Sequence, residues 1–261
     1  MIDIHSHIIF DVDDGPKSLE DSIKLLINAT TEGITEIIFT SHAFHPHYHA
    51  DVGTVKERIG VLQHGLEVHN IALKLHEGHE VRINEHICRQ IDDGSALTLA
   101  NSKYLLLELP SHGVPKYTFE MVNRIMAKNI VPIIAHPERN KGIAEKPELL
   151  EQLIRQGALS QITGGSIMGH FGRFVQHTAL KLIDANLVHT YGSDVHNLKS
   201  RPFLFDQGLN YLEKHKRSEY VDIFLGNNER IIANREILAF EPMIAEKKKW
   251  WNIFVGKNIN R

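Results

Sequence analysis

The chain has very little cysteine, because Cys88 is the only one among its 261 residues. A single cysteine cannot form an intramolecular disulfide, which fits a reducing compartment, and it cannot supply a cysteine-rich zinc site. A metal site in this chain must therefore be built mainly from other residue types.

An excess of basic charge and long hydrophobic runs are also missing. The formal net charge is −3, so no basic field attracts nucleic acid, and we expect no nucleic-acid partner. No apolar run reaches the roughly 20 residues that cross a membrane. Asp3 and two histidines interrupt the stretch where a signal peptide would lie. These absences predict a globular, cytoplasmic protein.

The end of the chain departs from this average. Residues 246–261 contain four lysines, one arginine, one glutamate and both tryptophans of the chain. Basic side chains near an anionic membrane surface contribute about 1 kcal/mol each. We therefore divide the chain into one domain, residues 1–245, and a basic-aromatic tail, residues 246–261. The tail is either solvated or makes weak contact with a membrane surface.

Short apolar runs alternate with amphipathic segments along the domain. Seven runs have the character of buried strands, at residues 1–7, 36–42, 73–81, 104–110, 130–137, 159–166 and 187–194. Helical spacing predicts helices at residues 18–32, 118–128, 147–156, 172–185 and 227–238, the last with Asn227 as its N-cap. Helix ends are expected at Gly33, Asn129, Gly157 and Asn186. This alternation indicates an α/β fold with a parallel sheet, either open or closed into a barrel.

Ionisable residues follow nearly every predicted strand. They are His5, His7, His42, His79, Glu80, Glu108, His136, Asp194 and His196. The carboxyl ends of parallel strands meet at one end of the sheet, so these side chains should lie together. His5 and His7 are two residues apart, so both imidazoles can face the same ion. Such crowding would be unfavourable unless divalent cations lay between the groups.

The segment SHAFHPHYH, residues 41–49, contains four histidines. His42 ends a predicted strand and is our candidate ligand. Pro46 excludes a central strand beyond it. His45, His47 and His49 are therefore predicted to line the rim of the site or lie in solvent.

A set of imidazoles and carboxylates without thiolate favours manganese, iron or zinc. Several carboxylates able to bridge ions suggest a cluster, and such clusters generate hydroxide and bind phosphoryl oxygens. Arg139 and Arg201 follow His136 and His196 closely, and a planar guanidinium matches a phosphate. The residues therefore indicate metal-dependent phosphate chemistry.

The ordered motifs resemble the PHP family (polymerase and histidinol phosphatase), and within it the bacterial tyrosine-protein phosphatases of capsule loci. The matching segments span residues 1 to about 240 and are MIDIHSHI, DDGP, TSHAFHP, GHEVRI, LLLELP, IIAHPERN, ITGGSIMGHFG and GSDVHN. The resemblance implies a distorted (β/α)7 barrel that holds three divalent metal ions, usually manganese.

The resemblance also implies roles for individual residues. One metal would be held by His5, His7, Glu80 and Asp194, a second by Glu80, Glu108 and His136, and the third by Asp14, His42 and His196. Arg139 and Arg201 would bind the phosphate of phosphotyrosine. A metal-bound hydroxide would attack phosphorus, and Asp14 or His42 would protonate the leaving phenolate.

The implied substrates are autophosphorylated bacterial tyrosine kinases with tyrosine-rich tails, which control capsule or exopolysaccharide synthesis. Because such a kinase is membrane-bound, residues 246–261 could recruit the protein to the inner face of the membrane.

Four rival interpretations are weaker. Asp11 and Asp13 resemble the Asp-x-Asp of haloacid-dehalogenase phosphatases, but Gly15 stands where threonine is needed and the histidines stay unexplained. A cysteine-based tyrosine phosphatase needs arginine six residues after its cysteine, where this chain has Gly94. A histidinol-phosphate phosphatase usually has histidine at the positions of Asp14 and Glu108. A silent metal-binding adaptor of the kinase would not need every ligand position filled.

Overall fold

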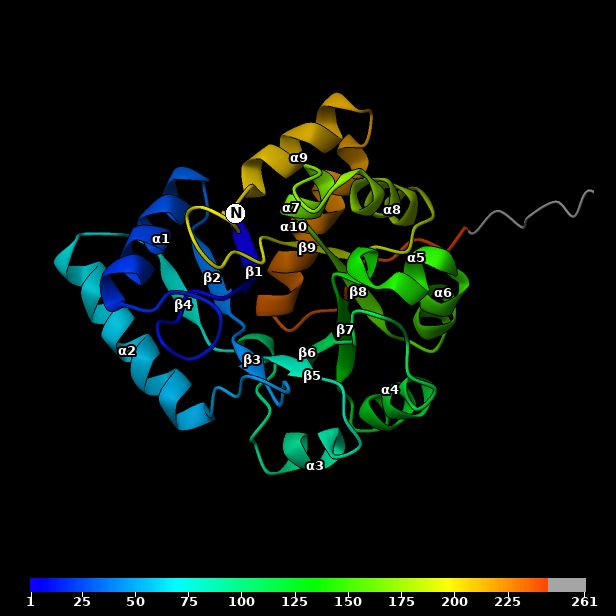
Figure 1. The fold of residues 1–261 in the computed structure, drawn as a ribbon, viewed down its shortest axis with the longest axis horizontal. Helices are drawn as coiled ribbons and strands as arrows, with labels where there is room; N and C mark the ends of the chain where they lie inside the picture. Colours follow the sequence, from blue (N-terminus) through cyan, green and yellow to red (C-terminus); the bar gives the residue numbers. More distant parts are fainter. Residues whose placement is uncertain (244–261) are drawn as a thin grey trace, which may run out of the picture.

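The computed structural model describes residues 1–243, in which parallel strands are surrounded by helices (Figure 1). Residues 246–261 and the end of the predicted domain lie outside the described residues. Within residues 1–243, no helix is both long and apolar enough to span a membrane.

The strands form two parallel sheets. They are β1 (Ile2–Ser6), β2 (Glu36–Phe39), β3 (His42–Ala43), β4 (Lys74–His76), β5 (Glu80–Arg82), β6 (Tyr104–Glu108), β7 (Val131–Ala135), β8 (Leu159–Thr163) and β9 (Thr190–Gly192). One sheet has the order β1-β2-β4 and the other β3-β5-β6-β7-β8-β9. β3 follows β2 after two residues and β5 follows β4 after three, so each pair behaves as one interrupted strand. The predicted seven strands are confirmed in this sense.

The last strand lies next to the first and closes the barrel. The backbone N–H of His7 donates to the carbonyl of Val195 at 2.9 Å, and that of Asp194 donates to the carbonyl of His5 at 2.8 Å. Asp3, buried in β1, accepts hydrogen bonds from the backbone and the hydroxyl of Ser193. Of the two sheet arrangements that the residue pattern left open, the closed one is therefore found, and the distorted (β/α)7 barrel implied by the family resemblance is confirmed.

Helices cover the outside of the barrel (Figure 1). They are α1 (Leu19–Thr31), α2 (Val52–Val68), α3 (Ile87–Asp92), α4 (Thr118–Met126), α5 (Lys141–Glu145), α6 (Glu148–Arg155), α7 (Gly164–Ile167), α8 (Arg173–Asp184), α9 (Phe205–Lys214) and α10 (Ser218–Ile232), with 3-10 turns η1 (Leu99–Asn101) and η2 (Pro137–Arg139). α1, α4, α6 and α8 match predicted helices. All four predicted helix-ending residues have positive φ, from +57° at Asn186 to +102° at Gly157, as left-handed C-terminal residues should.

The predicted helix at 227–238 exists, but its bounds and its N-cap are wrong. α10 begins at Ser218 and ends at Ile232, so Asn227 lies inside it and is fully buried. Its side-chain amide donates to the carbonyls of His189 and Leu238, at 2.7 and 2.8 Å. Asparagine is a favoured N-cap because its side chain bonds to backbone groups. Here it bonds to the backbone of other segments, which the local sequence does not reveal.

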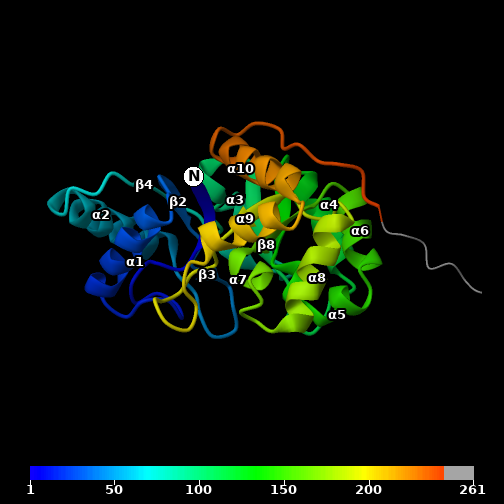
Figure 2. The ribbon, with the colours of Figure 1, turned by 90° about the horizontal axis from the view of Figure 1, so that it is seen from above.

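Two layers of apolar side chains make the core. The larger one joins the outer faces of the strands to the helices. The smaller one contains Ile4, Ile38, Leu106 and Ile133 from four strands together with Ile231 of α10, so it fills the barrel. α10 lies across the end where the strands begin (Figure 2), and Asn228 donates there to the carbonyl of Ile2. The opposite end, where the strands finish, is left for polar residues.

Candidate metal centre and substrate cavity

The structure brings all nine predicted ligands to the end of the barrel where the strands finish. Their nitrogen and oxygen atoms fall into four overlapping groups, and within each group the atoms lie within 4.8 Å of one another. The groups are His7, Asp14, His42 and His196; His5, His7 and Glu80; His5, His136 and Asp194; and His42, Glu80 and Glu108. Because several residues belong to two groups, more than one ion could share ligands here.

The first strand supplies two imidazoles through an irregular register. Asp3 pairs with Ile37 and Ser6 with Phe39, so β1 has one more residue than β2 between these points. Such a bulge re-aims side chains. It lets Ile4 pack in the barrel while His5 and His7 both turn toward the ligand cluster, where their Nε2 atoms lie 3.3 Å apart.

Hydrogen bonds at Nδ1 fix the tautomers of these two histidines. His5 Nδ1 donates to Gln161 Oε1 at 2.8 Å, and His7 Nδ1 donates to Asp13 Oδ2 at 2.9 Å. When the imidazoles are neutral, each Nε2 therefore carries a lone pair, and the two lone pairs face each other. This is the arrangement that metal-binding histidines adopt, with the far nitrogen held by an oxygen.

Carboxylate oxygens face the same lone pairs. Glu80 Oε2 lies 3.2 Å from His7 Nε2 and 3.0 Å from His42 Nδ1, and Asp194 Oδ1 lies 3.3 Å from His5 Nε2. Lone pairs and anionic oxygens at these distances repel one another in a buried site. Asp14 Oδ1, His42 Nδ1, Glu108 Oε2 and Asp194 Oδ1 are buried without a hydrogen-bond partner. Divalent cations fit this donor set, because they would satisfy these atoms and remove the repulsion.

Two of the nine residues have a left-handed backbone. His136 has φ +33° and Asp194 has φ +55°, values that side chains other than glycine rarely adopt. His136 follows directly on β7, and Pro137 after it disfavours the ordinary helical conformation there. Asp194 lies two residues beyond the end of β9. Strained residues of this kind cluster at functional sites. The turn lets His136 Nε2 reach Glu80 Oε1, at 2.7 Å.

The pKa values reflect charges packed under poor solvation. Burial raises the pKa of Glu80, but the nearby histidines outweigh it and lower this pKa well below the usual value. Burial also raises the pKa of Asp194, but Arg139 and Arg201 outweigh it and lower that pKa well below the usual value. Burial opposes protonation of His7, yet Asp13 and Glu80 raise its pKa well above the usual value. The carboxylates are thus ionised, and they favour a positive charge at His7. A proton or a metal ion can supply that charge.

The grouping of ligands differs in part from the sets that the resemblance implies. Asp14, His42 and His196 lie together as expected, with His7 added. His136, expected beside Glu80 and Glu108, groups with His5 and Asp194 instead, although it also bonds to Glu80.

Both predicted arginines reach the cluster. Arg201 Nη2 donates to Asp194 Oδ2 at 2.6 Å, and its Nη1 donates to His196 Nε2 at 2.7 Å. Arg139 Nη2 donates to the same Asp194 oxygen, and its guanidinium lies 4.8 Å from the centre of the Phe171 ring. The Nε of each arginine is buried without a partner, so each keeps a donor for a ligand.

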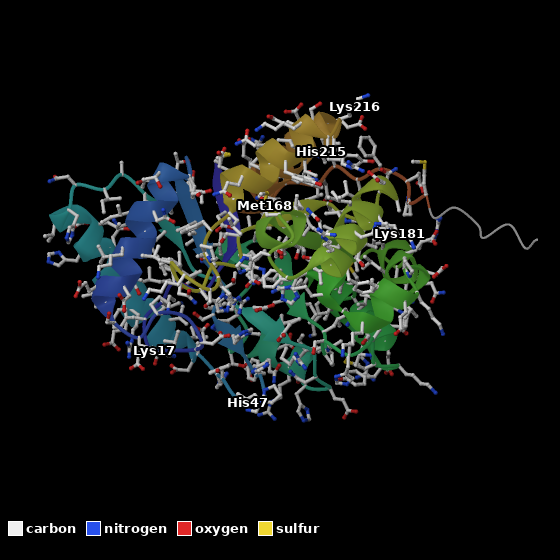
Figure 3. The ribbon with its side chains drawn as sticks, turned by 45° about the horizontal axis from the view of Figure 1, so that its top comes forward. Lys17, His47, Met168, Lys181, His215 and Lys216 are labelled. Carbon is white, nitrogen blue, oxygen red and sulfur yellow. The ribbon has the colours of Figure 1, made fainter. Side chains whose placement is uncertain are left out.

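A cavity of about 270 Å³ opens onto the cluster. It is lined by Asp14, His42, His45, Tyr48, Glu80, Glu108, Leu109, Ser111, Ile134, Ala135, His136, Pro137, Arg139, Asn140 and Arg201. Of the histidine-rich segment, His42 is a buried member of the cluster and His45 lines the cavity. His47 is exposed at the edge of the molecule (Figure 3). His49 is also exposed, and its Nδ1 accepts a hydrogen bond from Phe44. The prediction for the three later histidines agrees with these positions.

Sequence reasoning missed three residues that support the cluster. Asp13 and Gln161 hold His7 and His5, as described, and Arg82 Nη1 lies 2.9 Å from Glu108 Oε1. Arg82 follows Glu80 by two residues and so faces the same side of β5, which is a signal that could have been used. Gln161 gave no such signal, because it is 156 residues from His5.

The Asp-x-Asp pattern does not form the pair that a haloacid-dehalogenase phosphatase needs. Asp13 is buried and bonded to His7, whereas the Asp11 side chain is 68% exposed and lies 3.7 Å from Arg58. A nucleophile and an acid must both reach one phosphate, and these two carboxylates lie in different environments. That interpretation is therefore discarded.

Comparison with known proteins points in one direction. Residues 1–233 match the family described as capsular polysaccharide synthesis, CpsB/CapC. The chain is 39% identical to a putative tyrosine-protein phosphatase, CapC, of Staphylococcus aureus, over 96% of this chain and 98% of that protein. It is 37% identical to the tyrosine-protein phosphatase YwqE of Bacillus subtilis, over 97% of this chain and all of that protein.

A solved structure resembles this one closely. It comes from crystal structures of YwqE from Bacillus subtilis and CpsB from Streptococcus pneumoniae, described as metal-dependent tyrosine phosphatases. The TM-score is 0.91 at 37% identity, and the match covers 95% of this chain and 100% of the other.

Proposed function

Because this chain belongs to the CpsB/CapC family of capsular polysaccharide synthesis proteins, we propose that it is a metal-dependent protein-tyrosine phosphatase. The observation that carries the proposal is the cavity, which joins unsatisfied metal-ligand atoms to two guanidinium groups. A phosphate monoester entering it would find Arg139 and Arg201 as cationic partners for its oxygens, beside the proposed metal ions.

The proposed ligands are the nine residues of the cluster, and the proposed ions are divalent, with manganese first and iron or zinc as alternatives. Three ions are proposed from the family resemblance. When bound, such ions supply Lewis acidity and lower the pKa of coordinated water. Glu80 and Asp194 are both buried, and Glu80 belongs to two of the ligand groups, so its carboxylate can serve more than one ion.

The chain's own residues would position the phosphate and its leaving group. Arg139 and Arg201 line the cavity from two different loops, and their unpartnered Nε atoms can bind phosphate oxygens. Guanidinium donors that face developing charge lower the barrier because they need no reorganisation. Asp14 and His42 also line the cavity, so either can reach the phenolic oxygen that leaves.

The proton donor can be identified with substrates of graded leaving-group pKa. Removing a general acid slows substrates with basic leaving groups more than those with acidic ones. We expect such a slope change for only one of Asp14→Asn and His42→Gln, each measured with aryl phosphates after metal content has been checked. Parallel losses across the substrate series would remove both residues from this role.

The function is tested by hydrolysis of a phosphotyrosine peptide, compared with histidinol phosphate, by protein stripped with chelator and resupplied with Mn²⁺. Manganese-dependent hydrolysis of the peptide is expected. Preference for histidinol phosphate would place the protein in the biosynthetic branch of the PHP family. Absence of turnover with metal demonstrably bound would favour the silent adaptor.

We further propose that the natural substrate is an autophosphorylated bacterial tyrosine kinase with a tyrosine-rich tail. The support is the family's association with capsule synthesis and the tyrosine-phosphatase names of the relatives. Residues 246–261 would add weak contact with the anionic inner face of the membrane, on the strength of their composition alone. Vesicle binding that is unchanged after deletion of 246–261 would remove this role of the tail.

A further inference from the structure

The loop between His42 and Ala50 is closed at its base. The N–H of Ala50 donates to the carbonyl of His42 at 2.9 Å, and the N–H of Tyr48 bonds to the carbonyl of His45 at 3.3 Å. Immediately after the loop, Asp51 caps α2 by accepting from the N–H of Thr54 at 3.0 Å. Both ends of the loop are therefore fixed, one to the metal-ligand cluster and one to a helix.

Three aromatic rings stack along this loop. The His42 and His45 rings have centroids 4.9 Å apart at 25°, and the His45 and Tyr48 rings 5.5 Å apart at 16°. The Tyr48 ring also lies 5.9 Å from His42, at 14°. The Tyr48 ring is thus held nearly parallel to the ring of His42, a proposed metal ligand, and beside it. Parallel offset rings at these distances attract one another, so the geometry is pre-organised.

The cavity has two chemical characters. Asp14, Glu108, Arg139 and Arg201 give it charge, whereas Tyr48 and His45 give it aromatic surface and Leu109, Ala135 and Pro137 give it apolar surface. Its volume of about 270 Å³ exceeds the ~150 Å³ that holds a benzene molecule in an apolar cavity. A phosphate needs the charged residues only, so the aromatic and apolar lining has no partner unless the ester also carries a hydrophobic group.

We propose that Tyr48 forms an aromatic wall that packs against the phenyl ring of phosphotyrosine and selects aryl over alkyl phosphates. One bridging oxygen separates phosphorus from the ring, so a phosphate held beside His42 brings its ring next to Tyr48. A phosphoserine side chain has no ring to fill this space. The inference rests on the proposed function and identifies what would set its substrate preference.

The test uses binding rather than turnover. Benzylphosphonate mimics an aryl phosphate with the ester oxygen replaced by carbon, and ethylphosphonate offers the same head without a ring. Calorimetric titration of the full-length, manganese-loaded protein gives the ratio of the two affinities. We expect Tyr48→Ala to reduce the preference for benzylphosphonate about tenfold and Tyr48→Phe to retain it. His47→Ala is the matched control, since His47 lies in the same loop but is exposed.

An unchanged preference in Tyr48→Ala would overturn the inference, whether both affinities stay the same or both weaken equally. Tyr48→Leu keeps an apolar side chain in the loop and serves as the second variant if Tyr48→Ala melts early. Its preference should fall between those of the wild type and Tyr48→Ala. Failure of the proposed function would look different, because the ring preference would persist while the wild type left phosphotyrosine peptides intact.

Discussion

Replacing Asp13 with asparagine is the sharpest test of how the metal centre is built. The Asp13 carboxylate accepts three hydrogen bonds: from His7 Nδ1 at 2.9 Å, from the His42 backbone at 3.1 Å and from the Gly15 backbone at 2.9 Å. All three groups are donors. An asparagine of the same shape offers one acceptor oxygen and one NH₂ group, so in either orientation a donor must face a donor.

The magnitude follows from those two orientations. If the amide oxygen faces His7, the buried Gly15 N–H loses its acceptor, which costs about 1–3 kcal/mol of folding stability. If the NH₂ faces His7, Nδ1 of His7 must accept a hydrogen bond instead of donating one. The ring proton then moves to Nε2, which loses the lone pair that would bind a metal. Changing a residue that holds a ligating histidine typically weakens metal affinity 10- to 100-fold, or about 1.4–2.7 kcal/mol. Asp13→Asn should therefore bind manganese about 10- to 100-fold more weakly.

The assay is a competition titration against a chelating indicator at pH 8, with thermal melting to confirm the fold. Asp11→Asn is the matched control, because Asp11 is exposed and its positive φ suits asparagine equally well. Activity of Asp13→Asn should return at saturating Mn²⁺. Wild-type metal affinity in a folded Asp13→Asn protein would refute the idea that Asp13 orients His7 for a metal.

Three further expectations concern the centre directly. His136→Ala should abolish turnover and lower the number of bound metal ions measured by elemental analysis, and full occupancy would remove His136 from the ligand set. Arg139→Ala should retain its metal but lose about 10²–10³ in kcat/KM, and unchanged kinetics would exclude it from phosphate binding. Burial opposes protonation of His7 and His42, yet neighbouring carboxylates raise the pKa of both. These are Asp13 and Glu80 for His7, and Glu80 for His42. Protons therefore compete with the metal, so apparent Mn²⁺ affinity should fall as pH falls through those raised values, and a pH-independent affinity would contradict this.

Much of the site could be predicted from the sequence, because the fold brings the carboxyl ends of its strands together at one end of the barrel. A parallel barrel brings every strand terminus to the same mouth, so His5, Glu80, Glu108 and His136 could be grouped without any knowledge of distances. The same reasoning could not find Gln161. Its contact with His5 depends on which strands become neighbours when the barrel closes, and a glutamine at mid-strand is otherwise ordinary.

The helix that was missed has a local cause. α2 was not predicted, because only Val55, Leu62 and Leu66 of its seventeen residues are buried and three glycines interrupt it. α1, by contrast, buries Ile23, Leu25, Leu26 and Ala29, and its amphipathic spacing allowed it to be predicted.

Closure of the barrel has a consequence for how the protein is made. Asp3 and Ser193 are joined across 190 residues, and the same junction sets Asp194 beside His5. During synthesis His5 and His7 leave the ribosome long before Asp194, which arrives only with the last strand. Until that strand pairs with β1, the proposed ligand set is incomplete and the site is not enclosed. We therefore expect tight metal binding only after the barrel has closed, so that the finished fold, and not the nascent chain, would select the ion.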